Sequence, residues 1–124
     1  MTNETAFVYR LPVASLSWSS DSTRLLSTGD ENTVIIWDVT TGKTLLRYKG
    51  HSDSVSSAAW SPDEQDIASA GKDKTVQIFN TKTGKTIFTY KGHQQDIFDV
   101  AWSPSGKLLA SCDTAGNVHV WKAL

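Results

Sequence analysis

Short apolar stretches alternate with polar turns along the chain, most clearly within residues 55–90. Residues 75–79, Thr-Val-Gln-Ile-Phe, alternate polar and apolar side chains with a period of two, as a strand with one buried face does. Segments 55–60, 66–70 and 85–90 are also short and rich in small, β-branched and aromatic residues, with Pro, Gly, Asp and Asn in the turns between them. This pattern predicts four short antiparallel strands.

The same pattern returns with a period of 42 residues. Trp18, Trp60 and Trp102 have this spacing, and residues 41–44 and 83–86 both read Thr-Gly-Lys-Thr. Other positions that share the period are Trp37, Phe79 and Trp121, and the histidines of two Gly-His pairs, His51 and His93. The chain is therefore nearly all repeat, which leaves no room for a second domain.

Three periods define the expected domain organisation of the 124 residues. We expect a single domain, residues 1–124, with repeats at about 1–42, 43–84 and 85–124. One four-stranded sheet cannot bury both of its faces alone, but neighbouring sheets stacked face to face can. The predicted fold class is all-β, with three stacked blades of antiparallel strands.

Several motifs that recur in register resemble the WD-repeat family of β-propellers. These are the pairs Gly50-His51 and Trp37-Asp38, Trp-Ser-Pro-Asp at residues 60–63, and Ser-Ala-Gly-Lys-Asp at residues 69–73. The resemblance covers essentially the whole chain. It implies a non-catalytic scaffold for protein–protein interactions, without a cofactor.

The resemblance also implies a buried hydrogen-bond network that ties the strands and turns of each blade together. The residues at these positions are Ser27, Glu31, Trp37, His51, Ser69, Asp73, His93, Ser111 and Trp121. Every repeat departs from the family pattern. Tyr9 replaces the first histidine, Phe79 the second tryptophan and Ala115 the third aspartate. We therefore expect no blade to have the full set, and the second blade to hold its histidine best.

The same residues could be read as a hydrolase triad, with Ser69 as nucleophile, His51 as base and Asp73 as orienting group. We expect no catalytic residue, because the sequence has no Gly-x-Ser-x-Gly turn and a triad would need an oxyanion site and an open pocket. We also expect no metal site. His119 lies in a predicted strand, and the sequence offers no cluster of residues at ligand spacing.

In the family, partners usually bind the end of the blades that carries the Gly-His and Gly-Lys-Asp turns. The exposed positions there map to Pro12, Ala14, Asp30, Ser54, Ser56, Lys72, Asp96, Phe98 and Thr114. Phe98 is the expected anchor, because exposed aromatic side chains carry much of the energy of interfaces; the alternative is that a neighbouring loop covers it. Asp53, Asp96 and Asp99 hint at a preference for basic peptides.

Charge and cysteine content narrow the classes of partner and compartment. The net charge is −1, so we expect no nucleic-acid partner, because phosphate binding relies on a surplus of basic residues. The scattered Lys and Arg residues and the lack of a long apolar run argue against a membrane. Cys112 is the single cysteine, which we interpret as a small, unreactive, half-buried residue. These features predict a cytoplasmic protein.

Three blades are fewer than the four to eight that usually close a propeller. The third blade is expected to lack its outer strand, whereas a spare segment, residues 4–11, precedes the first inner strand. We expect this segment to complete the last blade of a second copy in a six-bladed homodimer, which is favoured over a nine-bladed homotrimer. Two alternatives remain open: a piece of a longer propeller, or a self-assembling structural fragment without a specific ligand.

Overall fold

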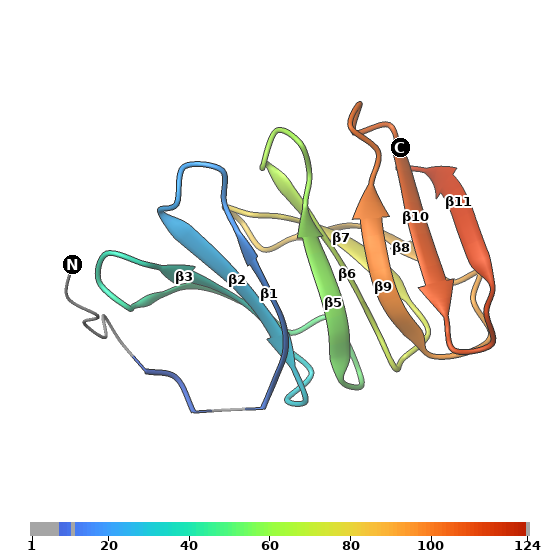
Figure 1. The fold of residues 1–124 in the computed structure, drawn as a ribbon, viewed down its shortest axis with the longest axis horizontal. Coiled ribbons are helices and arrows are strands. Elements are labelled where there is room, and N and C mark those ends of the chain that lie inside the picture. The colour runs from blue at the N-terminus through green and yellow to red at the C-terminus, as the bar shows by residue number, and fades with distance from the viewer. Residues whose placement is uncertain (1–7, 11, 124) are drawn as a thin grey trace, which may run out of the picture.

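Three antiparallel sheets stand side by side in the computed structural model, which describes residues 8–10 and 12–123 (Figure 1). Throughout this part of the chain the structure is all β, without a helix. It accordingly contains no helical segment of the length and apolar character needed to cross a membrane.

Each sheet is one blade, and its strands follow one another in sequence order. The first blade contains β1 (Val13–Trp18), β2 (Arg24–Gly29), β3 (Val34–Asp38) and β4 (Thr44–Tyr48). The second contains β5 (Val55–Trp60), β6 (Asp66–Gly71), β7 (Val76–Asn80) and β8 (Thr86–Tyr90). The third contains β9 (Ile97–Trp102), β10 (Leu108–Asp113) and β11 (Val118–Lys122). The strands predicted within residues 55–90 are confirmed to within one residue at each end.

The third blade has three strands in the described residues, as the sequence predicted, so β11 forms a free sheet edge. The segment expected to serve as an outer strand, residues 4–11, lies mostly outside the described residues. Its described part, residues 8–10, is not in a strand. The predicted strand exchange between copies therefore stays a prediction.

The turns repeat as faithfully as the strands. Residues with a positive φ, between 61° and 85°, recur with the 42-residue period. They are Ser22, Glu64 and Gly106 after the inner strand, Asn32, Lys74 and Gly116 after the second strand, and Gly42 and Gly84 after the third. Because left-handed backbone is costly outside glycine, its return at non-glycine positions shows that the same turn geometry is imposed on each blade.

The buried core lies between the blades. One cluster joins the first and second blades: Leu26, Val34, Ile36 and Tyr48 with Val55, Ala58, Ile67 and Phe79. The other joins the second and third: Ala68, Ala70, Val76 and Ile78 with Ile97, Val100, Leu109 and Ala123. Each blade thus has a forward face toward the following blade and a rear face toward the preceding one. Burial of these apolar faces is the main stabilising contribution to the stack.

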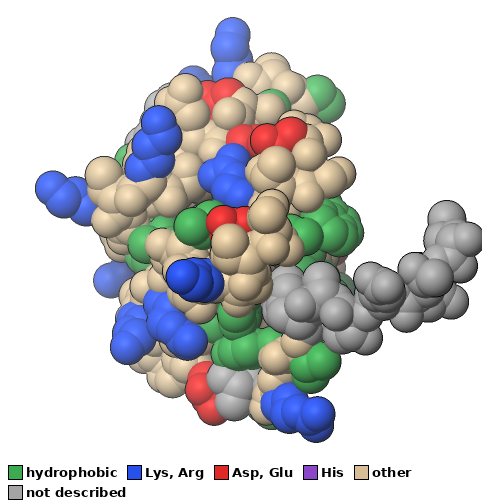
Figure 2. Space-filling model, turned by 90° about the vertical axis from the view of Figure 1, so that its left-hand side faces the viewer, with side chains coloured by type: hydrophobic (Ala, Val, Ile, Leu, Met, Phe, Trp, Pro, Cys, Tyr) green, Lys and Arg blue, Asp and Glu red, His purple; other side chains and the backbone are tan. Residues whose placement is uncertain are grey.

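Two apolar faces at the ends of the stack remain open. The rear face of the first blade exposes Val13, Leu16 and Trp18, and the forward face of the third blade exposes Val118 and Val120. Figure 2 views the molecule from the side of the first blade and shows hydrophobic side chains across the middle of this face. Large exposed apolar patches are in general a feature of interaction surfaces.

Candidate protein-binding rim

The second blade ties its turns together through His51. Nδ1 of His51 lies 2.9 Å from Oδ2 of Asp73, and Nε2 lies 2.7 Å from Oγ of Ser69. This geometry lets the N–H at Nδ1 donate to the carboxylate, while Nε2 shares a hydrogen bond with the hydroxyl of Ser69. Asp73 also accepts from the backbone N–H groups of Ser52 and Thr75. Both ring nitrogens have hydrogen-bond partners, so the imidazole is held in place between the turn and the strand.

The third blade contains the same relay with a different acid. Nδ1 of His93 lies 2.8 Å from Oδ2 of Asp113, and Nε2 lies 2.7 Å from Oγ of Ser111. The indole N–H of Trp121 donates to Ser111 at 3.4 Å. The expectation that Ala115 leaves this blade without an acid, and the second blade with the better-held histidine, was therefore wrong. The acid lies two residues earlier in the turn and reaches the imidazole from there.

The first blade keeps only part of the network. The indole N–H of Trp37 donates to Ser27 at 2.9 Å. Tyr9 packs edge-on against Trp37, with ring centroids 4.3 Å apart, and does not replace the imidazole in a relay. Glu31, at the position of the acid, is exposed, and a hollow lined by Tyr9, Ser27 and Glu31 lies beside the strands.

The two relays shift the titration of their acids in the same direction. Burial raises the pKa of Asp73, but the hydrogen bond from His51 and its charge, with further bonds from Thr75 and Ser52, outweigh burial and lower that pKa. The hydrogen bond from His93 is the largest influence on Asp113 and, with bonds from Asn117 and Ala115, lowers its pKa to about 2. Both carboxylates are therefore held as anions by their donors.

His93, Asp113 and His119 also bring their potential ligand atoms within 4.8 Å of one another. The two imidazoles are stacked, with centroids 3.8 Å apart and planes at 15°. The in-plane lone pairs of stacked rings do not converge on one point. Moreover, both nitrogens of His93 are hydrogen-bonded, and Nδ1 of His119 bonds the hydroxyl of Tyr90 at 2.7 Å. As arranged, these residues do not form a tetrahedral ligand set.

The relays lie at the end of the blades where the sequence placed a binding surface, and three backbone hydrogen bonds order that end. Each runs from a residue after the second strand to a residue before the inner strand: Asp30 to Pro12 at 3.4 Å, Lys72 to Ser54 at 2.9 Å and Thr114 to Asp96 at 2.9 Å. Six of the nine predicted binding positions thus form three equivalent pairs. We call the nine positions the binding rim.

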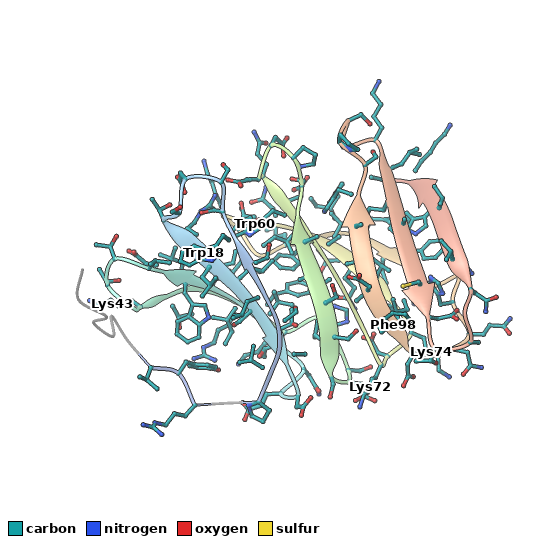
Figure 3. All side chains as sticks on the ribbon, in the orientation of Figure 1. Trp18, Lys43, Trp60, Lys72, Lys74 and Phe98 are labelled. Carbon is teal, nitrogen blue, oxygen red and sulfur yellow. The ribbon has the colours of Figure 1, made fainter. Side chains whose placement is uncertain are left out.

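Phe98 occupies the remaining inner-strand position of the rim in the third blade, with Ala14 and Ser56 as its equivalents. Its side chain is 54 % exposed, so no described loop covers it. Lys72 and Lys74 are also exposed, and Figure 3 places both at the same end of the molecule as Phe98. The sequence prediction did not include Lys74, which follows Asp73 directly in the turn.

Some rim groups already have structural partners. The hydroxyl of Ser56 lies within hydrogen-bonding distance of the carbonyl oxygens of Ala70 and Ile97, and so links the second blade to the third. Asp99 accepts the hydroxyl proton of Ser57 at 2.8 Å across the same joint. Asp99 therefore contributes to blade packing as well as to the charge near the rim.

Stacked blades of antiparallel strands whose inner strands, β1, β5 and β9, contact one another define a propeller-type protein. The family model of the WD domain, G-beta repeat, matches residues 6–38, 42–80 and 84–122. The chain therefore belongs to the WD40 repeat family. Repeats of this family generally mediate protein–protein interactions, and its proteins are typically non-enzymatic scaffolds. A search of curated proteins gives no match to the chain.

Proposed function

We propose that this chain is a non-catalytic scaffold that binds a protein or peptide at the binding rim, with Phe98 as the anchor. The observation that carries the proposal is that the side chain of Phe98 is 54 % exposed. Its strand, β9, is paired with β10 and packs against β5 of the second blade. An aromatic side chain on a rigid support buries a large area at a small entropic cost. The proposal takes residues 1–124 as one repeat domain and expects no cofactor.

A site-specific photo-crosslinker tests the rim. A benzophenone amino acid placed at Phe98 is compared with the same group at Phe88, an exposed phenylalanine on β8 away from the rim. The expected result is that position 98 captures proteins that position 88 does not. Identical capture at the two positions would reject the rim as the binding surface. The cytoplasmic location predicted from the sequence stays a prediction.

We further propose that self-association completes the propeller, with two copies forming a six-bladed ring. The supporting observation is the pair of open apolar faces. Val118 and Val120 are 69 % and 64 % exposed, whereas their equivalents in the second blade, Val76 and Ile78, are fully buried. A single chain leaves this surface in water, and a second copy removes it at two equivalent junctions.

Sedimentation equilibrium or native mass spectrometry at micromolar concentration tests self-association. We expect twice the mass of one chain, and a return to a single chain with Val120→Asp. Ile87→Asp is the matched control, because Ile87 is an exposed strand residue outside both open faces. Alkylation of Cys112, which lies on the forward face of the third blade, should slow as protein concentration rises. A folded single chain at these concentrations would overturn the proposal.

A further inference from the structure

We infer that two copies of this chain join head to tail in one register, with Leu16 of one copy against Ala110 of the other and the indole N–H of Trp18 donating to the carbonyl of Ala101. This inference rests on the proposed self-association and specifies its geometry. The contact joins the rear face of a first blade to the forward face of a third blade. It repeats the two joints already present inside the chain.

The two open faces are the unmatched halves of a joint that the chain forms twice. On the forward side, Leu26 and Val34 of the first blade correspond to Ala68 and Val76 of the second, which are all buried. Their equivalents in the third blade, Ala110 and Val118, face the open end. On the rear side, the buried Val55 and Ala58 correspond to Ile97 and Val100 in the third blade, and to the exposed Val13 and Leu16 in the first. Every one of these positions is apolar.

Side-chain size is complementary across each joint. In the cluster between the first and second blades, the larger Leu26 accompanies the small Ala58. Between the second and third blades the sizes are reversed, and the small Ala68 accompanies the larger Val100. The open faces offer the small Ala110 on the forward side and the large Leu16 on the rear side. Joining them would again pair one alanine with one larger side chain, so the end faces suit each other.

The forward face of the third blade contains a mainly apolar hollow of about 190 Å³. In the proposed dimer, the side chain of Leu16 from the second copy would lie in this hollow. The lining of the hollow includes Ala101, Ala110, Cys112 and Val118. For comparison, an engineered apolar cavity of about 150 Å³ accepts a benzene molecule. The hollow therefore has room for the branched side chain of Leu16 from a second copy, which is 64 % exposed in the single chain.

A repeated polar contact fixes the register. The indole N–H of Trp60 donates to the carbonyl of Ser17 in the preceding blade at 3.2 Å. Trp102 makes the equivalent bond to Ala59 at 3.0 Å. Trp18 is the third member of this series and is 57 % exposed, and no blade precedes it among the described residues. Figure 3 shows it at the same end of the molecule as Trp60. The same step of 43 residues makes Ala101 of another copy its acceptor.

A face-to-face pairing of two identical ends lacks these features. Two third blades would bring Ala110 against its own copy and leave the hollow unfilled, and Trp18 would keep no acceptor. Head-to-tail contact fills the apolar hollow with Leu16 and gives the indole N–H of Trp18 an acceptor. It also allows a closed ring, because contacts between unlike faces form rings when the rotation between subunits closes.

A size exchange tests the register. Leu16→Ala should raise the dimer dissociation constant at least about tenfold by leaving the hollow unfilled, and Ala110→Leu should weaken the dimer by crowding it. The double variant Leu16→Ala/Ala110→Leu reproduces the arrangement of Leu26 and Ala58 and should recover most of the loss. The wild-type chain is measured in parallel by sedimentation, and circular dichroism verifies folding. A wild-type dimer whose double variant shows no recovery overturns the register but leaves self-association standing. A wild-type monomer overturns both.

Mixing two blocked variants tests the head-to-tail order. Leu16→Asp blocks the rear face and Val120→Asp blocks the forward face, so each variant alone should be a single chain. A mixture retains one intact pair of unlike faces and should form a heterodimer. If the two ends instead paired with their own kind, one variant would dimerise alone and the mixture would add nothing, which would overturn the inference. Ile87→Asp, mixed with either variant, controls for added charge.

Discussion

Asp113 forms a hydrogen bond with His93 in the third blade, as Asp73 does with His51 in the second. Counted from the histidine along the chain, Asp113 comes two residues earlier than Asp73. The two distances are 2.8 and 2.9 Å, so the shift in sequence does not lengthen the hydrogen bond. The turn after β10 makes this possible, because the backbone N–H groups of Ala115 and Asn117 both donate to the other oxygen of Asp113. The relay is therefore maintained by geometry and does not depend on an aligned residue.

Replacement of Asp113 by Asn should lower the melting temperature at pH 7 and lower it less in acid. The pKa of Asp113 in the folded protein is about 2, below the usual value of 3.8 for an aspartate, so its ionised form contributes stability above about pH 4. This contribution is lost as the pH falls toward 2, where the carboxylate is protonated in the folded state as well. Thermal unfolding of both proteins between pH 7 and pH 2 measures the narrowing difference. Asp30→Asn, at an exposed position, is the control, and a difference independent of pH would contradict this role.

His51→Ala and His93→Ala should destabilise the protein by similar amounts, about 1–3 kcal/mol each, because each leaves a buried serine and a carboxylate without their partner. The sequence alone predicted a better-held histidine in the second blade. In the structure both histidines are hydrogen-bonded to an aspartate and to a serine. Urea unfolding gives both free energies. Lys49→Ala, an exposed neighbour of the Gly-His turn, should change stability little. A large difference between the two histidine variants would show that the relays are not equivalent.

Tyr48→Phe should cost more than Tyr90→Phe, although the two tyrosines occupy equivalent positions. Tyr48 is buried, and its hydroxyl donates to Gln77 and bonds Thr86, so its loss leaves a buried amide oxygen unpaired. Tyr90 is less buried and bonds only His119 through its hydroxyl among the described residues. We expect about 1–2 kcal/mol for the first variant and less than about 1 kcal/mol for the second. Chemical unfolding tests this order, which equal losses would contradict.

Trp102→Phe and Trp18→Phe should separate folding from assembly. Trp102 donates to Ala59 across an internal joint, so its replacement should reduce the unfolding free energy of the single chain by about 1 kcal/mol. Trp18 has no such bond within the described chain and is exposed. Its replacement should leave the stability of the single chain unchanged and weaken the dimer. The measurements are unfolding at a concentration where the chain is monomeric, and sedimentation at higher concentration.

Much of the fold follows from local sequence pattern. The 42-residue period, the alternating segments and the turn residues were enough to predict the four strands of the second blade and the three strands that the described residues of the third blade form. These features depend on short-range propensity and on burial of alternate positions, both of which are visible in the sequence. The nine rim positions followed from the family resemblance, and the structure brings six of them together in pairs.

Contacts that depend on side-chain reach were less predictable. Alignment by the period placed Ala115 opposite Asp73, although an acid stood two residues earlier, in the same turn. Asp113 could have indicated a complete relay in the third blade. A fixed period, however, gives only the expected position of a residue and not the direction in which a turn orients its side chains. The bond from Tyr48 to Gln77 crosses between the first and second blades, and the stacking of His93 on His119 joins a turn to a strand of the third blade. The period of the sequence gives no direct clue to either contact.

Large and small side chains alternate across the joints between blades, so each blade packs well only against its present neighbours. Exchanging the second and third blades in the gene would set Leu26 against Val100, with too much volume, and Ala110 against Ala58, with too little. A circular permutation that starts at the second blade would instead preserve every neighbour in a closed ring. In the proposed ring the repeats can therefore be cut at a new starting point, but their order cannot be changed without loss of packing at the joints.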